Sequence, residues 1–486
     1  MKKFIVVIMT LCMMVSALCV PVFAAPDLFK EVVISVRALK EDATFEVIGE
    51  YSELDDGWNA AMDIAESSSE MEDNNYDRIV VDLWVDWTAD DGWFTDDILQ
   101  GDGFKWRTIY VPTDARVTLN MNGHTINRGL TCDEADGAVI YIAENADVII
   151  NDGTVTGGWS DNGAGGIHIC EKANVILNNV NVVGNSVTAD DGAGIAVYDK
   201  ATLIMNGGSI SNNFLDNYVG LFNIKIHSYG ALYVSDATVK LNKVTVSDNN
   251  TIDGSAQGVA IYAEDSTVTM DECIVSGNAA ALGSHRNADS VIAAYDSKIT
   301  ITNTDFTNNA ASNVEYGSEN ARLFYLEDSR LTMKVGKITG NNADTLFEME
   351  DSVADIHRVT ITDNASVVIL VNNDSQKINM TECIIGNNTP NTNISEILVA
   401  TKGTLVMTDC KLGDSTFKNK EYIVFVNGFN GRALSASLFG EGSLTMIISI
   451  LALVASIASI GISFSLYKKK AVPVAANSDA KSDDEE

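Results

Sequence analysis

Proline and histidine are both rare in this chain, with 5 residues of each among 486. A proline removes a hydrogen-bond donor from a β-ladder, so its scarcity favours long runs of paired strand. The histidines fall in unrelated segments and form neither an HExxH motif nor a closely spaced pair. The sequence therefore offers no histidine-based motif for a metal or a catalytic triad.

Basic residues are also scarce, because 32 lysines and arginines face 67 aspartates and glutamates, which gives a formal net charge of -35. Binding of a phosphate backbone needs concentrated positive charge, so this balance argues against a nucleic-acid partner. The excess of acidic residues is more compatible with a cation or a neutral sugar as the ligand. Repulsion between acidic surfaces, which keeps a secreted protein soluble, explains the same balance without any ligand.

Both ends of the chain carry long apolar runs. Residues 1–25 combine two lysines, an apolar stretch and small residues at their end, which is typical of a secretory signal peptide. A lipid anchor at Cys19 is the alternative, although Leu18 is bulky for the position before such a cysteine. Residues 443–467 contain no charged residue and, as a helix, can cross a hydrocarbon core of about 30 Å. We predict one transmembrane helix there, since a buried core helix would need a polar face.

The charges beside this predicted span indicate its orientation. Lys468, Lys469 and Lys470 follow it directly, and the positive-inside tendency places them in the cytoplasm. The sequence thus predicts a single-pass type I protein of the cell membrane, with an extracellular part, a linker over residues 429–442 and a cytoplasmic tail over residues 468–486. This order resembles that of Gram-positive surface proteins, although no LPxTG-like motif precedes the span.

A repeated phrase organises most of the remaining chain, as in "DSTVTMDECIVSGN" (residues 265–278) and "DSKITITNTDFTNN". Its apolar positions at Val268, Met270, Cys273 and Val275 step by two, which indicates strands, and once by three, which indicates a corner. Short apolar runs such as "GALYVSD" and "GVAIYAED" stand upstream. Eleven copies share the position of Met270, namely Leu119, Ile150, Leu177, Met205, Leu241, Met270, Ile301, Met333, Ile356, Met380 and Met407.

One further column supports a stack of coils. Eight residues after the shared position, eight successive copies carry an asparagine, at Asn185, Asn213, Asn249, Asn278, Asn309, Asn341, Asn364 and Asn388. Asparagine tolerates left-handed backbone at a sharp corner, and stacked amides can hydrogen-bond as a ladder. We expect these residues to have a structural role.

These features predict an all-β chain, a right-handed parallel β-helix of about eleven coils over residues 111–428. A leucine-rich horseshoe would need a leucine consensus, and a propeller would need longer repeats. Residues 26–110 hold five of the six tryptophans and a helical spacing at Trp58 and Met62, so we expect an N-terminal α/β cap over the open end of the core. A separate aromatic sugar-binding module is the alternative.

The cysteines do not predict a disulfide framework. Five of the seven remain once the predicted signal peptide is removed, and an odd number is a poor basis for such a framework. Cys383 and Cys410 fall at the inward corner position of adjacent copies, so the question of a bond between them stays open.

The chain resembles the pectin-lyase-like superfamily of right-handed parallel β-helices. "VTLNMNGHTI" (residues 117–126) looks like the opening coil of such proteins, while "GGIHI" at Gly165 and "FTNN" at Phe306 look like the repeats of polymorphic outer-membrane proteins. The resemblance implies a fold and raises the expectation of activity on polysaccharides, which the fold alone does not establish.

The irregular loops between copies hold the candidate functional residues. Several early loops are acidic, and if they align along one edge, their carboxylates and aromatic rings could bind Ca²⁺ or carry acid and base steps on a polysaccharide. Solvated acidic turns are the simpler alternative. The candidate residues are Asp133, Glu134, Asp136, Trp159, Asp161, Asp190, Asp191, Asp216 and Tyr218.

The specific signatures of related enzymes are missing. Polygalacturonases of this superfamily are expected to show NTD, DD, GHG and RIK motifs in successive coils, but here "NTD" at Asn303 follows "ADD", "NGHT" at His124 comes first, and no RIK follows. Lyases need a basic residue beside bound calcium, and only Arg128 and Lys172 lie near the acidic loops.

The sequence therefore leaves two hypotheses for the function. The first is a membrane-anchored surface protein that acts as an adhesin or binds extracellular glycans without catalysis. The second is a polysaccharide lyase or glycoside hydrolase that uses two of the acidic loop residues. The sequence favours the first and leaves the ligand and the oligomeric state open.

Overall fold

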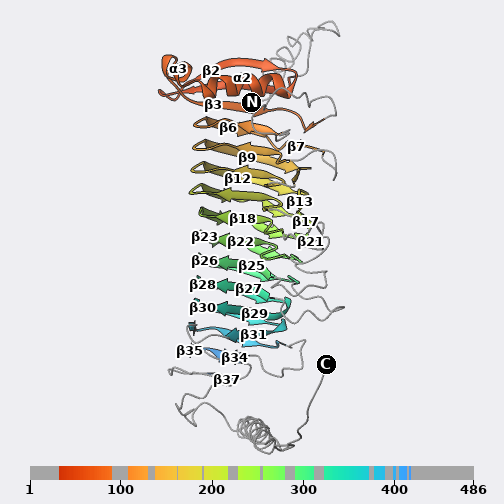
Figure 1. Ribbon diagram of the computed structural model, residues 1–486, viewed down its shortest axis with the longest axis vertical. Helices are drawn as coiled ribbons and strands as arrows, with labels where there is room; N and C mark the ends of the chain where they lie inside the picture. Colours follow the sequence, from red (N-terminus) through yellow and green to blue (C-terminus); the bar gives the residue numbers. More distant parts are fainter. Residues whose placement is uncertain are drawn as a thin grey trace, which may run out of the picture. The chain divides into compact units, whose positions relative to one another are not determined.

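A computed structural model (Figure 1) describes residues 32–89, 108–129, 137–160, 163–188, 191–216, 228–251, 256–279, 290–310, 322–371, 377–388, 398–400, 404–412 and 415–416. All of them belong to one compact unit, Met1–Gly428. The second unit, Phe429–Glu486, lies outside the described residues, as do the predicted signal peptide and the predicted membrane span. Within the described ranges, neither helix has the length and apolar character that a membrane crossing requires.

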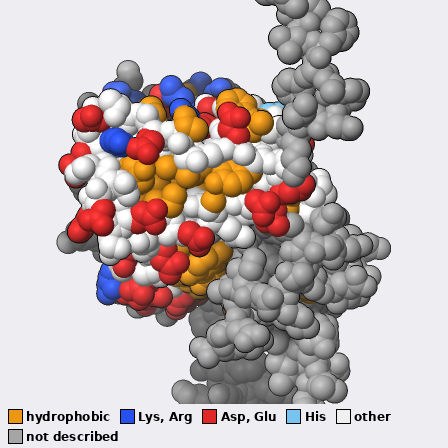
Figure 2. Space-filling model, turned by 90° about the horizontal axis from the view of Figure 1, so that it is seen from above, with side chains coloured by type: hydrophobic (Ala, Val, Ile, Leu, Met, Phe, Trp, Pro, Cys, Tyr) orange, Lys and Arg blue, Asp and Glu red, His pale blue; other side chains and the backbone are white. Residues whose placement is uncertain are grey.

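A small α/β layer precedes the coils (Figure 1). Its elements are β1 (Ile34–Lys40), β2 (Phe45–Tyr51), α2 (Leu54–Glu66), α3 (Ser68–Asp73) and β3 (Tyr76–Leu83). β1 pairs antiparallel with both β2 and β3. The predicted helical spacing is confirmed in α2, where Trp58 and Met62 lie in the same hydrophobic core as the coils. The Trp58 indole also donates to the Tyr110 carbonyl at 2.9 Å, so the helix is tied to the first coil. Seen from above, this end of the unit carries hydrophobic side chains between acidic and basic ones (Figure 2).

The coils are built from three sheets whose strands pair in parallel from one coil to the next (Figure 1). An eleven-stranded sheet contains β5 (Ile109–Val111), β8 (Ile140–Ile142), β11 (Ile167–Ile169), β14 (Ile195–Tyr198), β18 (Leu232–Ser235), β22 (Ile261–Glu264), β25 (Ser290–Tyr295), β27 (Arg322–Glu327), β29 (Asn342–Glu350), β31 (Ala365–Val371) and β34 (Leu398–Ala400). A four-stranded sheet contains β10 (Trp159–Ser160), β13 (Ser186–Thr188), β17 (Phe214–Asp216) and β21 (Asn250–Thr251).

The third sheet has 22 strands, because it includes β1, β2 and β3 and folds around the corner of every coil. Its other members are β4 (Trp87–Thr88), β6 (Arg116–Asn120), β7 (Thr125–Asn127), β9 (Asp147–Thr156), β12 (Asn174–Val183), β15 (Thr202–Asn206), β16 (Ser209–Ser211), β19 (Thr238–Asn242), β20 (Thr245–Ser247), β23 (Thr267–Asp271), β24 (Ile274–Ser276), β26 (Lys298–Thr307), β28 (Arg330–Thr339), β30 (Val353–Thr362), β32 (Lys377–Thr381), β33 (Ile384–Gly386), β35 (Thr404–Thr408), β36 (Lys411–Leu412) and β37 (Ser415–Thr416).

The repeat predicted from the sequence is confirmed by the strand register. All eleven residues equivalent to Met270 pair in register from coil to coil. Val81 of β3 pairs with Leu119 in the same column. Since β3, β4 and β5 pair in parallel with β6, β7 and β8, the first coil begins at Tyr76, inside residues 26–110 that the sequence analysis assigned to the cap.

The predicted corner lies where the apolar spacing steps by three. In every copy after the first, the residue two positions beyond the shared apolar residue has a positive φ, as in Glu272 at 52° and Asn303 at 49°. Left-handed backbone turns the chain while both flanking strands keep their inward side chains. Val335 occupies this position with a φ of 57°, which is an unfavourable conformation for a β-branched residue.

The asparagine column forms a continuous buried ladder. The side chain of Asn278 donates to Asn309 Oδ1 at 3.0 Å and accepts the Asn249 side chain at 2.8 Å. The same pattern links all eight residues from Asn185 to Asn388. Each of them is at most 6% exposed.

The expected left-handed backbone at the ladder asparagines is wrong. The left-handed residue is the one before each of them, such as Gly277 before Asn278, with a φ of 65°, and Gly340 before Asn341, with a φ of 69°. The preceding residue makes the sharp turn, so the asparagine itself can direct its amide toward the buried interior. One residue therefore makes the turn, and the asparagine that follows it makes the ladder.

A serine ladder, which the sequence analysis did not identify, is formed by the serine of the "DS" in four successive copies, namely Ser266, Ser297, Ser329 and Ser352. Ser297 Oγ accepts the backbone N–H of Ser266 at 2.9 Å, and Ser329 Oγ accepts that of Ser297 at 2.9 Å. Each hydroxyl donates to the carbonyl two residues earlier, as Ser297 does to Tyr295 at 2.6 Å. The aspartate before each serine, such as Asp296, has a positive φ and makes the turn out of the eleven-stranded sheet.

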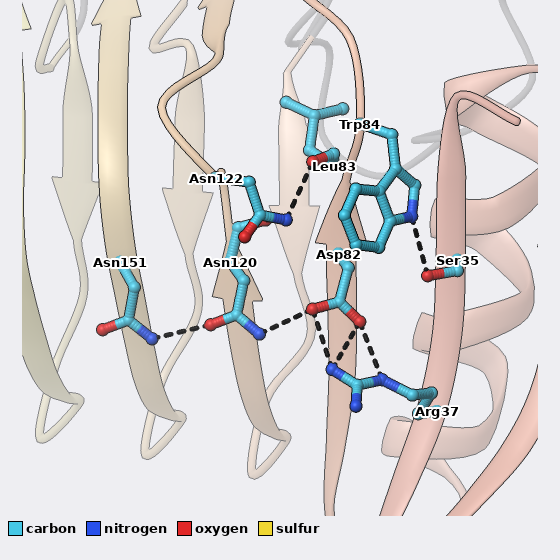
Figure 3. Close-up of polar contacts among 8 residues, drawn as sticks. All are labelled: Ser35, Arg37, Asp82, Leu83, Trp84, Asn120, Asn122 and Asn151. Carbon is cyan, nitrogen blue, oxygen red and sulfur yellow. Dashed lines mark hydrogen bonds and ion pairs between the residues drawn. The ribbon is translucent and has the colours of Figure 1, made fainter. Parts of the chain in front are cut away.

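A second asparagine ladder runs along the outer face of the large sheet and ends at the cap (Figure 3). Asn151 donates to Asn120 Oδ1 at 2.8 Å, and Asn120 donates to Asp82 Oδ1 at 2.8 Å. Asp82 in turn accepts both Nε and Nη2 of Arg37 at 2.8 Å. The ladder continues away from the cap through Asn178, Asn206 and Asn242.

Candidate functional site

The outer face of the eleven-stranded sheet carries an aromatic ring on every strand from β5 to β27. Side chains alternate along a strand, so in β18 Leu232 and Val234 enter the core while Tyr233 points outward. Parallel register then brings the outward rings of successive strands side by side. We call these rings the tyrosine stripe: Tyr110, Tyr141, His168, Tyr198, Tyr229, Tyr233, Tyr262, Tyr295 and Tyr325.

The stripe stays continuous even though its rings do not all occupy one column. β14 has Ala196 at the position that pairs with Tyr233, but Tyr198 follows two residues later. β25 shows the same exchange, with Ala293 and then Tyr295. Two residues along a strand return to the same face, so each displaced ring still contacts its neighbours. Each strand thus contributes one outward ring, either at the position equivalent to Tyr233 or two residues later.

Neighbouring rings pack against one another along the whole stripe. From Tyr110 to Tyr325, successive ring centroids are between 4.7 and 5.8 Å apart. Aromatic pairs at such separations contribute about 0.5–1.5 kcal/mol each beyond the area that they bury. Three of these pairs are stacked, with interplanar angles of 6–19°, and the other four are tilted by 32–54°. The rings cover one another so closely that Tyr233, Tyr262 and Tyr325 are each at most 8% exposed.

The rings of the stripe are uncharged at neutral pH. Burial raises the pKa of Tyr233 and Tyr262 above its ordinary value, so both phenols keep their protons. Burial also lowers the pKa of His168 to about 4, since the ring lies between those of Tyr141 and Tyr198. The stripe therefore presents neutral hydrogen-bonding groups on an apolar base.

Carboxylates lie beside several rings of the stripe on β22, β27 and β29. Tyr325 donates its hydroxyl to Glu327 at 2.9 Å, and Tyr262 donates to Glu264 at 3.5 Å. Glu350 pairs with Glu327 in the parallel register. Burial, followed by the charge of Glu327, raises the pKa of the Glu350 carboxyl. This end of the stripe offers several acceptors for hydroxyl or ammonium protons.

A buried ion pair lies among these groups. Arg322 donates through Nε and Nη2 to the two carboxylate oxygens of Glu348, at 2.6 and 2.7 Å. The guanidinium also lies over the Tyr325 ring, with Cζ 5.0 Å from the ring centroid. Neither partner of the pair is more than 6% exposed. A bidentate pair of this kind holds the arginine in one orientation.

Three of the predicted site residues fall within the described part of the chain. Asp191 pairs with Tyr229 in a parallel bridge and so lies beside the stripe, whereas Trp159 begins β10 and Asp216 ends β17, both in the four-stranded sheet. The described residues thus do not place these three on one sheet. The other predicted residues, Asp133, Glu134, Asp136, Asp161, Asp190 and Tyr218, lie outside the described residues.

Other groups that could carry chemistry are limited in the described ranges. No cluster of three or more His, Cys, Asp or Glu side chains arranged to hold a metal occurs there. Cys273, Cys383 and Cys410 are free thiols buried at the corner column. Cys170 lies on the stripe face, and burial raises the pKa of its thiol to about 11. Burial also raises the pKa of the Cys273 thiol, so Cys170 and Cys273 are protonated. Cys383 and Cys410 interact with each other, and this interaction raises the pKa of Cys383 and lowers that of Cys410.

The sequence analysis missed the tyrosine stripe, although a signal was present. The apolar runs "GALYVSD" and "GVAIYAED" each carry one tyrosine between two core residues, at Tyr233 and Tyr262. A tyrosine between two core residues of a strand lies on the face turned away from the core, where Tyr233 and Tyr262 form a second buried cluster. The signal was hidden because the β14 and β25 tyrosines are displaced by two residues.

One family model supports this architecture. The model described as "Right handed beta helix region" matches residues 115–289. No curated protein and no solved structure matches the chain. The match and the parallel strand pairing together define the class of protein as a right-handed parallel β-helix with aromatic residues along one outer sheet.

Proposed function

We propose that this protein is a membrane-anchored, extracellular β-helix that binds glycans along its tyrosine stripe without cleaving them. The observation that carries the proposal is the stripe itself, an outward aromatic ring on each of eight successive strands of one sheet. Tyrosine combines a rigid apolar ring with a hydroxyl, and it is enriched at protein interfaces.

The repeated geometry of the stripe suits a polymer. Each coil presents a similar set of ring edges and hydroxyl groups, so successive units of a chain-like ligand could meet similar contacts. Neutral groups dominate, and hydrogen bonding to sugar hydroxyls needs no charge. The apolar runs at the two ends of the sequence support secretion and membrane anchoring, which would display this face outside the cell.

The test is a binding measurement on the full-length protein in detergent micelles. Tyr262→Ala, which removes a ring from the middle of the stripe, should weaken polysaccharide binding at least tenfold. Phe45→Ala removes a ring that is 54% exposed on the cap and serves as the matched control, with no expected change. Binding that is unaffected by Tyr262→Ala would overturn the proposal.

The same samples separate binding from catalysis. The rival function, cleavage by an acidic edge, rests on the position of Asp191 beside Tyr229. Polysaccharide recovered after incubation should keep its length if the protein only binds. Shortened products that disappear with Asp191→Asn would establish the enzyme instead.

A further inference from the structure

The first two coils turn a corner of the large sheet between β3 and β4 and between β6 and β7. Trp84 lies at this corner, is 48% exposed, and donates its indole N–H to Ser35 Oγ at 3.0 Å (Figure 3). On the next coil, Asn122 is exposed and donates to the Leu83 carbonyl at 3.0 Å. The corner thus holds an exposed ring whose orientation is fixed, with an exposed amide on the neighbouring coil.

A histidine and a carboxylate meet at the same corner. His124 Nδ1 lies 3.3 Å from Asp86 Oδ1, which also accepts the backbone N–H of Thr125 at 2.9 Å. The carboxylate favours the tautomer in which Nδ1 carries the proton, so Nε2 is left as an acceptor. The side chains of Asp86 and His124 are 72% and 32% exposed, so both can be reached from solvent.

Open space adjoins these side chains. Gly123 stands between Asn122 and His124, and a Cβ atom placed on it would meet no atom of a non-neighbouring residue within 4 Å. Its N–H donates to the carbonyl of Asp152, which belongs to the corner of the third coil and is exposed. A ligand can therefore approach this corner between two exposed aspartates, Asp86 on one neighbouring coil and Asp152 on the other.

The free polar atoms at this corner are acceptors. Asn122 uses its Nδ2 group on Leu83, and no described residue donates to Asn122 Oδ1 or to Asp86 Oδ2. No lysine or arginine occurs in residues 84–86, 121–125 or 151–154, so both aspartates lack a basic neighbour within these segments. A ligand that fits this set must supply hydrogen-bond donors, and positive charge on it would be attracted.

Two kinds of cation meet this description, a metal ion and an ammonium group. A metal ion needs several ligand atoms that converge at short distance, and the described residues contain no group of three or more His, Cys, Asp or Glu arranged in this way. An ammonium group carries three donors that point in different directions and no acceptor, so its partners can lie further apart. The corner therefore suits an ammonium group better.

Trp84 indicates what the ammonium group is attached to. It lies two residues before Asp86, so their α-carbons are at most about 7 Å apart. Because its N–H is already used by Ser35, the exposed part of the indole offers an apolar surface. A sugar chain can place one ring on this surface and the amino group of the same or the next sugar at Asp86, whereas a lysine side chain would leave the indole unused.

We infer that Trp84, Asp86, Asn122 and His124 form a second binding site, which takes a sugar with a free amino group. The ammonium group donates to Asp86 Oδ2 and to the neighbouring acceptors, and a sugar ring lies on the indole. This site is on the large sheet and the tyrosine stripe is on the eleven-stranded sheet, so the inference goes beyond the proposed function.

The experiment compares two ligands that differ in one group. Glucosamine oligosaccharides and their fully N-acetylated counterparts of equal length are titrated into the full-length protein in detergent micelles at neutral pH, and the heat of binding is measured. Acetylation removes the charge and two of the three donors. We expect the free amine to bind at least about tenfold more tightly, since a hydrogen bond between charged groups contributes more than a neutral one. Equal affinities would overturn the inference.

Two variants locate the binding at this corner. Asp86→Asn removes the charge but keeps a side-chain oxygen for the Thr125 N–H, and Trp84→Ala removes the ring. Each should weaken binding of the free amine about tenfold or more. The matched control is Asp63→Asn on the exposed side of α2, which changes the net charge equally and should have no effect. An equal loss with Asp63→Asn would show only general charge attraction and would overturn the site.

Further outcomes separate this site from other ligands and from the tyrosine stripe. Tighter binding of a lysine-rich peptide than of the amino sugar, or loss of binding on addition of a metal chelator, would overturn the assignment to a sugar amine. Tyr262→Ala should leave binding of the free amine unchanged, even where it abolishes binding of neutral polysaccharide. Failure at the stripe and failure at the corner are therefore distinguishable, and thermal unfolding shows that each variant is folded.

Discussion

Replacing Asn278 with alanine tests how much stability the buried asparagine ladder provides. Its Oδ1 accepts the backbone N–H of Asn249 at 3.2 Å and the Asn249 side chain at 2.8 Å. Its Nδ2 donates to Asn309 at 3.0 Å and to the Val246 carbonyl at 2.9 Å. Alanine removes these four hydrogen bonds and a fifth, from Nδ2 to the Ser276 carbonyl at 3.2 Å, at a position that is 0% exposed.

The magnitude follows from the groups left without this partner. The Asn249 side chain keeps its bond to the Ile210 carbonyl, and Asn309 Oδ1 keeps the backbone N–H of residue 278. The Asn249 N–H and the Val246 carbonyl each lose a buried partner, at about 1–3 kcal/mol for each group. We therefore expect Asn278→Ala to lower the free energy of unfolding by about 2–6 kcal/mol.

Hydrogen exchange is the suitable assay, because stacked coils can open locally and each coil depends on its neighbours. Exchange should accelerate most in β20 and β24 and less toward the cap. The control is Asn242→Ala in the outer ladder, where the lost bond to Asn206 is 2.9 Å long and water can replace it. That variant should cost less than about 1 kcal/mol. Equal losses in the two variants would refute the reasoning.

Three further predictions concern single positions. Val335, with a φ of 57° and 43% exposure, is strained, so Val335→Asn should raise the free energy of unfolding by about 1 kcal/mol in thermal denaturation, whereas Val353→Asn in extended backbone should not. The pKa of Glu350 is raised in the folded state above its ordinary 4.5, so stability should fall as pH rises through that pKa, and a stability profile of Glu350→Gln should lack this fall. Cys383 and Cys410 are free thiols, so alkylation of the unreduced, unfolded chain should label both, and a mass showing them bonded would contradict this assignment.

Much of the fold could be predicted because the information is local and repeated. The step of two residues between Val268 and Met270 and the step of three to Cys273 define strand and corner in each copy. Repetition over eleven copies then fixes the register without any tertiary knowledge. The location of the sharp turn at Gly277 rather than Asn278 could not be read from the column, since both residue types adopt left-handed backbone.

The candidate site was less predictable for a physical reason. Acidic turn residues attract attention in a sequence, yet only Asp191 among those described lies beside the stripe. The ion pair between Arg322 and Glu348 joins residues that are 26 positions apart in the sequence, and no sequence motif predicts it. Outward residues of a parallel sheet become neighbours only through register, so Tyr198 and Tyr295 reveal their role only when the coils are stacked.

The tyrosine stripe also has a fixed scale. Its spacing is set by the backbone hydrogen bonds between strands, at about 4.8 Å per coil, and the side chains cannot change it. Any ligand that occupies several coils at once must therefore have a repeat commensurate with this length, or else skip coils in a regular way. Under the proposed glycan binding, adding or deleting a whole coil would change how many ligand units the stripe can hold, while the spacing between them would stay the same.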